Sequence, residues 1–185
     1  HTSIILLCAV MYAICCGAAA HAATVGMMLP IGPQILTAVT FPAHLFFYVM
    51  VRSGVTRHWR DPGLMVMQNL YALLAISFAY ITLDPSERGM VLVLIALVIV
   101  FGMYTHTPRL SVLHGVLAMV LLGPAKGVLS SVDPAYYPHQ QEFLRFGVML
   151  GSLPVLIFTA YLISSWRKRL SSQRRELQLA LDQVQ

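Results

Sequence analysis

Apolar segments long enough to cross a lipid bilayer follow one another along this chain, and they constrain its fold more than any other feature. Hydrophobic residues make up 58% of the 185 residues and charged residues only 10%, whereas ordinary soluble domains are roughly half apolar and about a quarter charged. So few charges cannot cover the surface of a soluble domain of this length. The composition predicts an integral membrane protein and excludes a disordered chain, a collagen-like chain and a nucleic-acid-binding module.

Six segments approach the roughly 20 mostly apolar residues that a membrane helix needs. We expect them at residues 2–26, 35–51, 63–83, 89–105, 108–129 and 143–165, with Pro33 bounding the second. Asp61 and Pro62 are expected to cap and begin the third segment, and Pro108 to begin the fifth. Pro154 is expected to kink the sixth. The pattern predicts an all-α, polytopic fold with a six-helix transmembrane domain over residues 1–165.

The basic residues of the loops predict how the helices are oriented. Seven fall on the side of the loop between the second and third segments and three on the opposite side: Arg52, Arg57, Arg60, Arg109, Arg167, Lys168 and Arg169 against Arg88, Lys126 and Arg145. The richer side is expected to be cytoplasmic, and six spans then place both termini there. We expect a bacterial inner membrane, with contacts to anionic lipid headgroups on this side.

The last residues, 166–185, form a separate polar segment in which apolar side chains keep a regular spacing. Leu170, Leu177 and Val184 are seven residues apart, and with Leu181 they make a narrow seam that is typical of a parallel coiled coil. The alternative is an amphipathic helix that lies on the membrane. No helix breaker separates this segment from the sixth span, so we expect one continuous cytoplasmic signalling helix.

Two further patterns concern assembly and the extent of the chain. Gly147 and Gly151 are four residues apart on the sixth span, a spacing that lets two membrane helices approach closely. They predict either a homodimer seam that leads into the coiled coil or packing within one bundle. The chain begins at His1 rather than Met, and the helical pattern continues to Gln185. We therefore expect a fragment that lacks an output domain.

Short motifs in a constant order resemble the six-span N-terminal sensor module of bacterial GGDEF diguanylate cyclases. The resemblance covers the chain from about Phe41 onward. The motifs are residues 47–54 (FYVMVRSG), 60–64 (RDPGL) with Gln68, Arg88-Gly89, 101–103 (FGM), 107–109 (TPR), Asp133-Pro134 with Tyr137-Pro138, and the tail 173–177 (QRREL) and 180–185 (ALDQVQ).

This resemblance implies a membrane-embedded sensory input module that controls a fused cytoplasmic cyclase. Two cyclase domains must meet to join two GTP molecules into cyclic di-GMP, so GTP and Mg²⁺ would belong to the missing output domain alone. No GGDEF motif lies in these residues. Related membrane modules carry a histidine kinase instead, and that alternative stays open.

Ionisable and polar residues inside the spans are the candidate sites, because they are costly in a bilayer. His44 lies in the second span and His114 in the fifth. If these spans are adjacent, the two imidazoles could hold haem b or a metal ion; the alternative is a hydrogen bond from each to a neighbouring helix. Gln68, Asn69 and Tyr71 on the third span are candidates for a ligand pocket or for interhelical hydrogen bonds.

The cysteines suggest a second, weaker metal site. Cys15, Cys16 and His21 lie on the first span, and thiolate and imidazole are ligands that suit Cu(I). The alternative is that these cysteines are small packing residues. The total of three cysteines, including Cys8, argues against a disulfide framework.

No catalytic constellation is apparent. The acidic residues lie at loops or in the tail: Asp61, Asp84, Glu87, Asp133, Glu142, Glu176 and Asp182. Buried acids are typical of ion-coupled transporters, so a small permease is the weaker alternative. The sequence predicts a sensory input module that responds to an unknown small ligand. A haem- or metal-dependent redox or gas sensor and a purely structural membrane anchor are the other interpretations.

Overall fold

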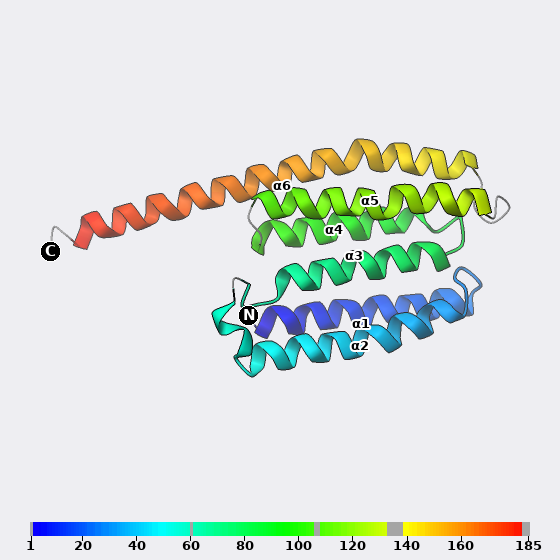
Figure 1. The fold of residues 1–185 in the computed structure, drawn as a ribbon, viewed down its shortest axis with the longest axis horizontal. Coiled ribbons are helices and arrows are strands. Elements are labelled where there is room, and N and C mark those ends of the chain that lie inside the picture. The colour runs from blue at the N-terminus through cyan, green and yellow to red at the C-terminus, as the bar shows by residue number, and fades with distance from the viewer. Residues whose placement is uncertain (1, 60, 106–107, 133–138, 183–185) are drawn as a thin grey trace.

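The computed structural model describes residues 2–59, 61–105, 108–132 and 139–182, and every regular element in those ranges is a helix. The predicted all-α fold is therefore confirmed. Figure 1 shows the long helices lying side by side, with α1 and α2 at one edge of the bundle and α5 and α6 at the other. The elements are α1 (Thr2–Thr24), α2 (Ile31–Arg52), the short 3₁₀ helix η1 (Val55–His58), α3 (Met65–Thr82), α4 (Gly89–Thr105), α5 (Pro108–Val132) and α6 (His139–Asp182).

Several helix boundaries differ from those expected. Helix α2 begins at Ile31 rather than at residue 35, because Pro33 fits its first turn, where a backbone N–H needs no helical partner. Helix α3 begins at Met65 instead of residue 63, so Pro62 precedes the helix. Leu64 holds the N-cap position, and Asp61 lies three residues earlier, where its Oδ2 accepts a 2.8 Å hydrogen bond from the backbone N–H of Val66 in the first turn.

The main hydrophobic core lies between α3, α4, α5 and α6. On α4, Val91, Ile95 and Ile99 recur every four residues and form one buried face. They pack with side chains of the other three helices, namely Leu73, Tyr80, Ala118, Leu122, Leu153 and Ala160. In the described part of the chain, α1 and α2 make no backbone contact with α4, α5 or α6, so α3 joins the two halves of the bundle.

The outer surface of the bundle is apolar, which fits a lipid environment. Val93 is 69% exposed, Leu45 63% and Phe158 61%, and contiguous apolar exposure on this scale is rare in soluble monomers. Among the described residues, four helices are long and apolar enough to cross a membrane: α1, α2, α3 and α6. Shorter apolar stretches occupy α4 and α5, at Gly89–Val100 and Val112–Gly123. Membrane insertion is supported, and the number of six spans stays a prediction.

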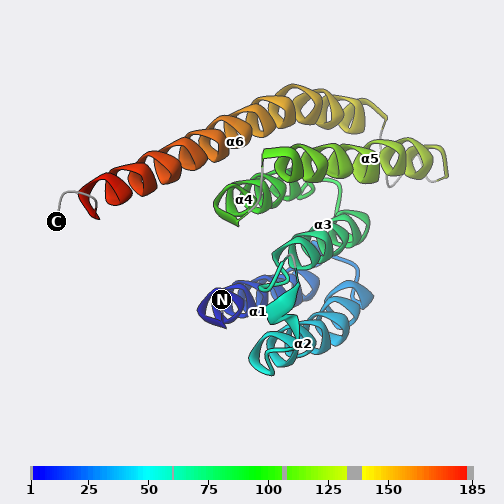
Figure 2. The same ribbon diagram turned by 60° about the vertical axis from the view of Figure 1, so that its left-hand side comes forward.

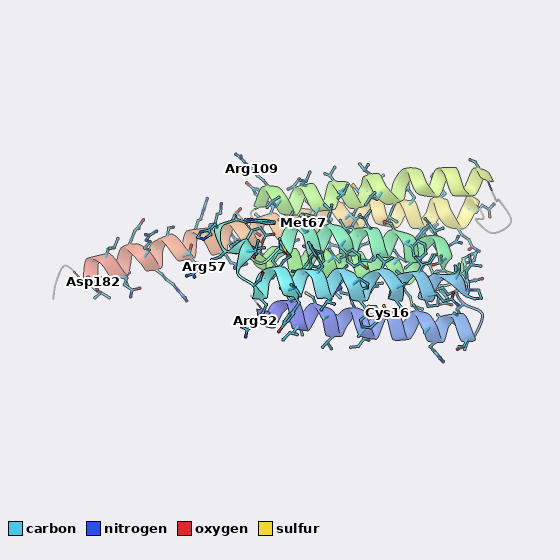
Figure 3. All side chains as sticks on the ribbon, turned by 60° about the horizontal axis from the view of Figure 1, so that its bottom comes forward. Cys16, Arg52, Arg57, Met67, Arg109 and Asp182 are labelled. Atoms are coloured by element: carbon cyan, nitrogen blue, oxygen red, sulfur yellow. The ribbon has the colours of Figure 1, made fainter. Side chains whose placement is uncertain are left out.

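The two ends of the bundle have different characters. At one end, called here the tail end, lie the N-terminus, η1 and the point where α6 leaves the bundle (Figure 1). Figure 3 shows Arg52, Arg57 and Arg109 gathered at this end. At the opposite end, called the rim end, the loop after α1 meets the turn after α3: the backbone N–H of Leu29 donates to Thr82 O and that of Asp84 to Met27 O, each at 2.8 Å.

Helix α6 is one unbroken helix of 44 residues that contains Pro154. Figures 1 and 2 show it running along the bundle and then continuing past every other element as a separate, gently curved rod. All of its described residues from Trp166 onward are exposed. The expected continuous extension of the sixth helix is therefore observed as far as Asp182.

Candidate functional site

Three aromatic rings surround one buried histidine where α1, α2 and α3 meet. Helix α2 contributes His44 and Phe47, which lie three residues apart and so share a face. The His44 ring lies 4.2 Å from the ring of Tyr12 on α1, 5.8 Å from that of Tyr71 on α3 and 6.0 Å from that of Phe47, between centroids. We call Tyr12, His44, Phe47 and Tyr71 the aromatic–histidine cluster.

One hydrogen bond within α2 sets the tautomer of the neutral His44 ring. Its Nδ1 lies 3.0 Å from the backbone oxygen of Thr40. A carbonyl oxygen only accepts, so Nδ1 carries the hydrogen and Nε2 of the neutral ring has a free lone pair. The hydroxyl of Thr40 lies 2.7 Å from that of Tyr71, so the same residue joins α2 to α3. His44 therefore presents a hydrogen-bond acceptor in a fixed orientation.

Three buried polar atoms in this part of the bundle have no hydrogen-bond partner among the residues that the structure describes. They are the Tyr12 hydroxyl, His44 Nε2 and Gln68 Oε1. Gln68 lies one turn from Tyr71 on the same face of α3, and its Nε2 donates a 2.8 Å hydrogen bond to Gly63 O. Each unsatisfied buried group costs about 1–3 kcal/mol. They lie on α1, α2 and α3, and they make this region the candidate site.

The structure does not bring His44 and His114 together. His114 is buried on α5, where its Nδ1 donates a 2.7 Å hydrogen bond to Leu110 O. In the described part of the chain α2 and α5 share no backbone contact, because α3 lies between them (Figures 1 and 2). The predicted haem site required these two helices to be adjacent, so the packing does not support it.

The other candidates on α3 separate into two groups. Gln68 and Tyr71 share one face of α3, and their role in a ligand pocket stays a prediction. Asn69 is half-buried and lies about 100° around the helix from Gln68. The sequence analysis missed Tyr12, because a tyrosine within an apolar segment carries no positional signal. The only hint was its spacing of four residues from Cys8 and Cys16, which places the three on one face of α1.

The predicted copper ligands do not form a metal site. Cys16 is buried whereas Cys15 and His21 are exposed, so these side chains point in different directions. No group of three or more His, Cys, Asp or Glu side chains in the described residues is placed to hold a metal ion. The cysteines are free thiols, and Cys16 acts as the small packing residue of the alternative interpretation.

Gly147 and Gly151 lie on the outer face of α6 and do not pack within the bundle. A methyl group added at either position would meet no atom within 4 Å. Gly147 lines a shallow apolar depression with Phe143, Leu144 and Val148, and Phe143 is 79% exposed. The described residues therefore give no support to packing of these glycines within one bundle, and the homodimer seam stays a prediction.

The leucines of the tail lie on a different face of α6 from these glycines. Leu170 and Leu177 continue, at intervals of seven, the line of Leu156 and Ile163, which pack against the core. Leu177 is 68% exposed, Leu181 60% and Leu170 58%. Val184 lies outside the described residues. The seam of the tail is thus the core-facing side of α6 prolonged beyond the bundle, where no other element covers it.

A buried arginine organises the rim end, although its position in the sequence predicted only a loop charge and part of a short motif. Arg88 is 0% exposed, its Nε donates a 3.0 Å hydrogen bond to Leu83 O, and its guanidinium lies 5.5 Å from the centre of the Tyr80 ring. Arg145 of α6 donates to Pro85 O in the same turn. The rim end therefore connects the turn between α3 and α4 directly to α6.

No family model, curated protein or solved structure matches the chain. What the chain does must therefore be inferred from its own residues and their arrangement.

Proposed function

We propose that the chain is a membrane-embedded sensory input and dimerisation module that passes a signal along α6 to a cytoplasmic output domain. The observation that carries this proposal is the single helix of 44 residues that belongs to the bundle over one half and stands free over the other. Because the helix has no break, a shift or rotation of the part packed in the bundle also moves the free part, and with it any domain attached to the free part. The sequence resemblance makes a diguanylate cyclase the proposed output.

The proposed orientation places the tail end in the cytoplasm of a bacterial inner membrane, with six spans and both termini inside. Two features support this proposal. The N-terminus and the free half of α6 lie at the same end of the bundle (Figure 1). Arg52, Arg57 and Arg109 gather at that end (Figure 3), and cytoplasmic loops are the ones enriched in Lys and Arg.

The proposed dimer forms through the leucine seam of the tail. Exposed leucines at intervals of seven are the pattern that a parallel coiled coil buries, and here they are Leu170 and Leu177, followed by Leu181. The glycine face around Gly147 offers a second surface on the same helix, in another direction. If α6 rotates, the dimer contact would pass from the leucine seam to the glycine face. The two contacts would then be the two packings of similar energy that a switch needs.

Cysteine cross-linking tests the dimer directly. In the chain with its three native cysteines replaced by serine, we expect Leu177→Cys to form a disulfide-linked dimer in membranes, because residues at a coiled-coil core position face their counterparts. Arg175→Cys is the matched control, since it lies on the opposite side of the same helical turn. Equal cross-linking of the two variants would contradict the proposed seam.

Insertions into the tail test whether α6 transmits the signal. With a diguanylate cyclase reporter fused after Gln185, we expect insertion of one to six residues between Arg169 and Leu170 to alter cyclic di-GMP production. Insertion of seven residues should restore it, because seven residues return the helix to the same coiled-coil phase. Production that is independent of insert length would reduce the module to a structural anchor.

A further inference from the structure

The aromatic–histidine cluster and Gln68, one turn from Tyr71 on α3, have unused hydrogen-bonding capacity, and most of it consists of acceptors. His44 Nε2 and Gln68 Oε1 only accept in the protonation state and orientation described above, while the Tyr12 hydroxyl both donates and accepts. His44 is 6% exposed and Gln68 4%, so neither atom is satisfied by surrounding solvent. A molecule that completes these hydrogen bonds must itself carry a donor.

The helices around the cluster exclude a charged ligand. No Asp, Glu, Lys or Arg occurs from Thr2 to Val51, which includes α1 and most of α2, or within α3 from Met65 to Thr82. A charged ligand would therefore lose its hydration without gaining a counter-charge, which costs several kcal/mol (order of magnitude). The rings of Tyr12, Phe47 and Tyr71 instead favour a ligand with an aromatic face, because such rings prefer stacked or edge-to-face partners.

From these observations we propose that the aromatic–histidine cluster, with Tyr12 and His44 as its hydrogen-bonding groups, forms a binding site for a small, uncharged aromatic molecule that carries a hydroxyl or N–H donor, of the phenol or indole class. Such molecules dissolve in the bilayer and reach the site from the lipid. The donor binds His44 Nε2, and the ligand ring lies among the rings of the cluster.

The packing of α1 allows the site to open. Helix α1 makes backbone contacts with α2 and with no other helix in the described residues, so it lies at the edge of the bundle (Figure 2). From α1, the Tyr12 ring reaches to within 5.7 Å of the Tyr71 ring, between centroids. Displacement of the Tyr12 ring or a small shift of α1 admits a ligand without disturbing the core between α3 and α6.

The role of this ligand as the stimulus rests on the proposed function, but its binding does not. Tyr71 lies on α3, whose Leu73 and Tyr80 belong to the main core with α6 residues Leu153 and Ala160. Helix α3 contacts α4 and α5, and both of these contact α6, so a ligand that repositions α3 would act on α6 through them.

Pairs of ligands that differ by one hydrogen-bond donor test the site. We would measure the unfolding midpoint of the purified chain with indole and with 1-methylindole, and likewise with phenol and anisole. A ligand at ten times its dissociation constant should raise the midpoint by roughly 3–6 °C. We expect this shift with indole or phenol and a much smaller one with the methylated analogue, which lacks the donor but partitions into detergent at least as well.

Variants localise the effect. His44→Phe keeps a ring of similar bulk but removes Nε2, so the difference between each ligand and its methylated analogue should disappear. The control His21→Phe changes an exposed histidine of α1 and should keep the difference. An equal shift with each ligand and its methylated analogue in the unmodified chain, or an unchanged difference in His44→Phe, would overturn the proposal.

Nuclear magnetic resonance keeps the test valid even if His44→Phe fails to fold. The unmodified chain is labelled with nitrogen-15 at histidine. Indole should change the chemical shift of His44 Nε2, because the Nε2 lone pair then accepts a hydrogen bond, and 1-methylindole should leave that shift unchanged. An unmoved signal at saturating indole would refute the site. Binding with no change in reporter output would leave the site standing and count against its role as the stimulus.

Discussion

Replacing Gly115 with leucine should destabilise the protein more than any other glycine substitution in the described residues, by about 3 kcal/mol, the upper end of the cost of overpacking. Gly115 is buried on α5, and a methyl group added there would overlap Cγ1 and Cδ1 of Ile157 on α6. Ile157 is β-branched and helical, so its side chain has few rotamers to retreat into. Reversible unfolding in mixed detergent, followed by circular dichroism, measures the effect.

Gly127 provides the matched control for this prediction. It lies on the same helix, but an added methyl group there would meet nothing within 4 Å. Gly127→Ala should therefore raise the free energy of unfolding by about 0.5–1 kcal/mol through helix propensity, whereas Gly115→Ala should lower it. The same sign for the two alanine variants would mean that α5 and α6 are not packed at Gly115 as described.

Replacing Arg88 with alanine should cost about 3 kcal/mol of stability. The substitution leaves a cavity in place of a side chain that is 0% exposed, and it removes the hydrogen bond to Leu83 O and the contact with the Tyr80 ring. Large effects of single substitutions come from cavities and lost buried networks of this kind. The unfolding midpoint of the purified chain in detergent checks this result.

Two further variants identify what Arg88 contributes. Arg88→Lys keeps the charge but lacks the planar guanidinium, so it should recover less than half of the lost stability. Arg174→Ala removes an arginine from the exposed tail and should change the free energy of unfolding by less than about 0.5 kcal/mol. If Arg88→Ala were as mild as Arg174→Ala, the rim end would not depend on this buried arginine.

Three of the five residues of the candidate site (Tyr12, His44, Phe47, Gln68 and Tyr71) could be predicted from the sequence. His44, Gln68 and Tyr71 were identified because polar residues within apolar spans are costly and therefore informative. Tyr12 was missed, since an aromatic residue is ordinary in a membrane helix. The pairing of His44 with His114 required the second and fifth spans to be adjacent. Spacing along the chain does not determine which helices pack together.

The sequence by itself determined the class of the protein, the all-helical fold and the continuity of α6. Scarce charges exclude a soluble surface, and a segment without breakers after the sixth apolar stretch continues as a helix; both are local properties. Only the tertiary structure decided that His44 faces Tyr12, that Arg88 is buried and that Gly147 and Gly151 face outward. The physical reason is that α1 and α4 are apolar on every side, so their sequences do not distinguish the face that packs from the face that meets lipid.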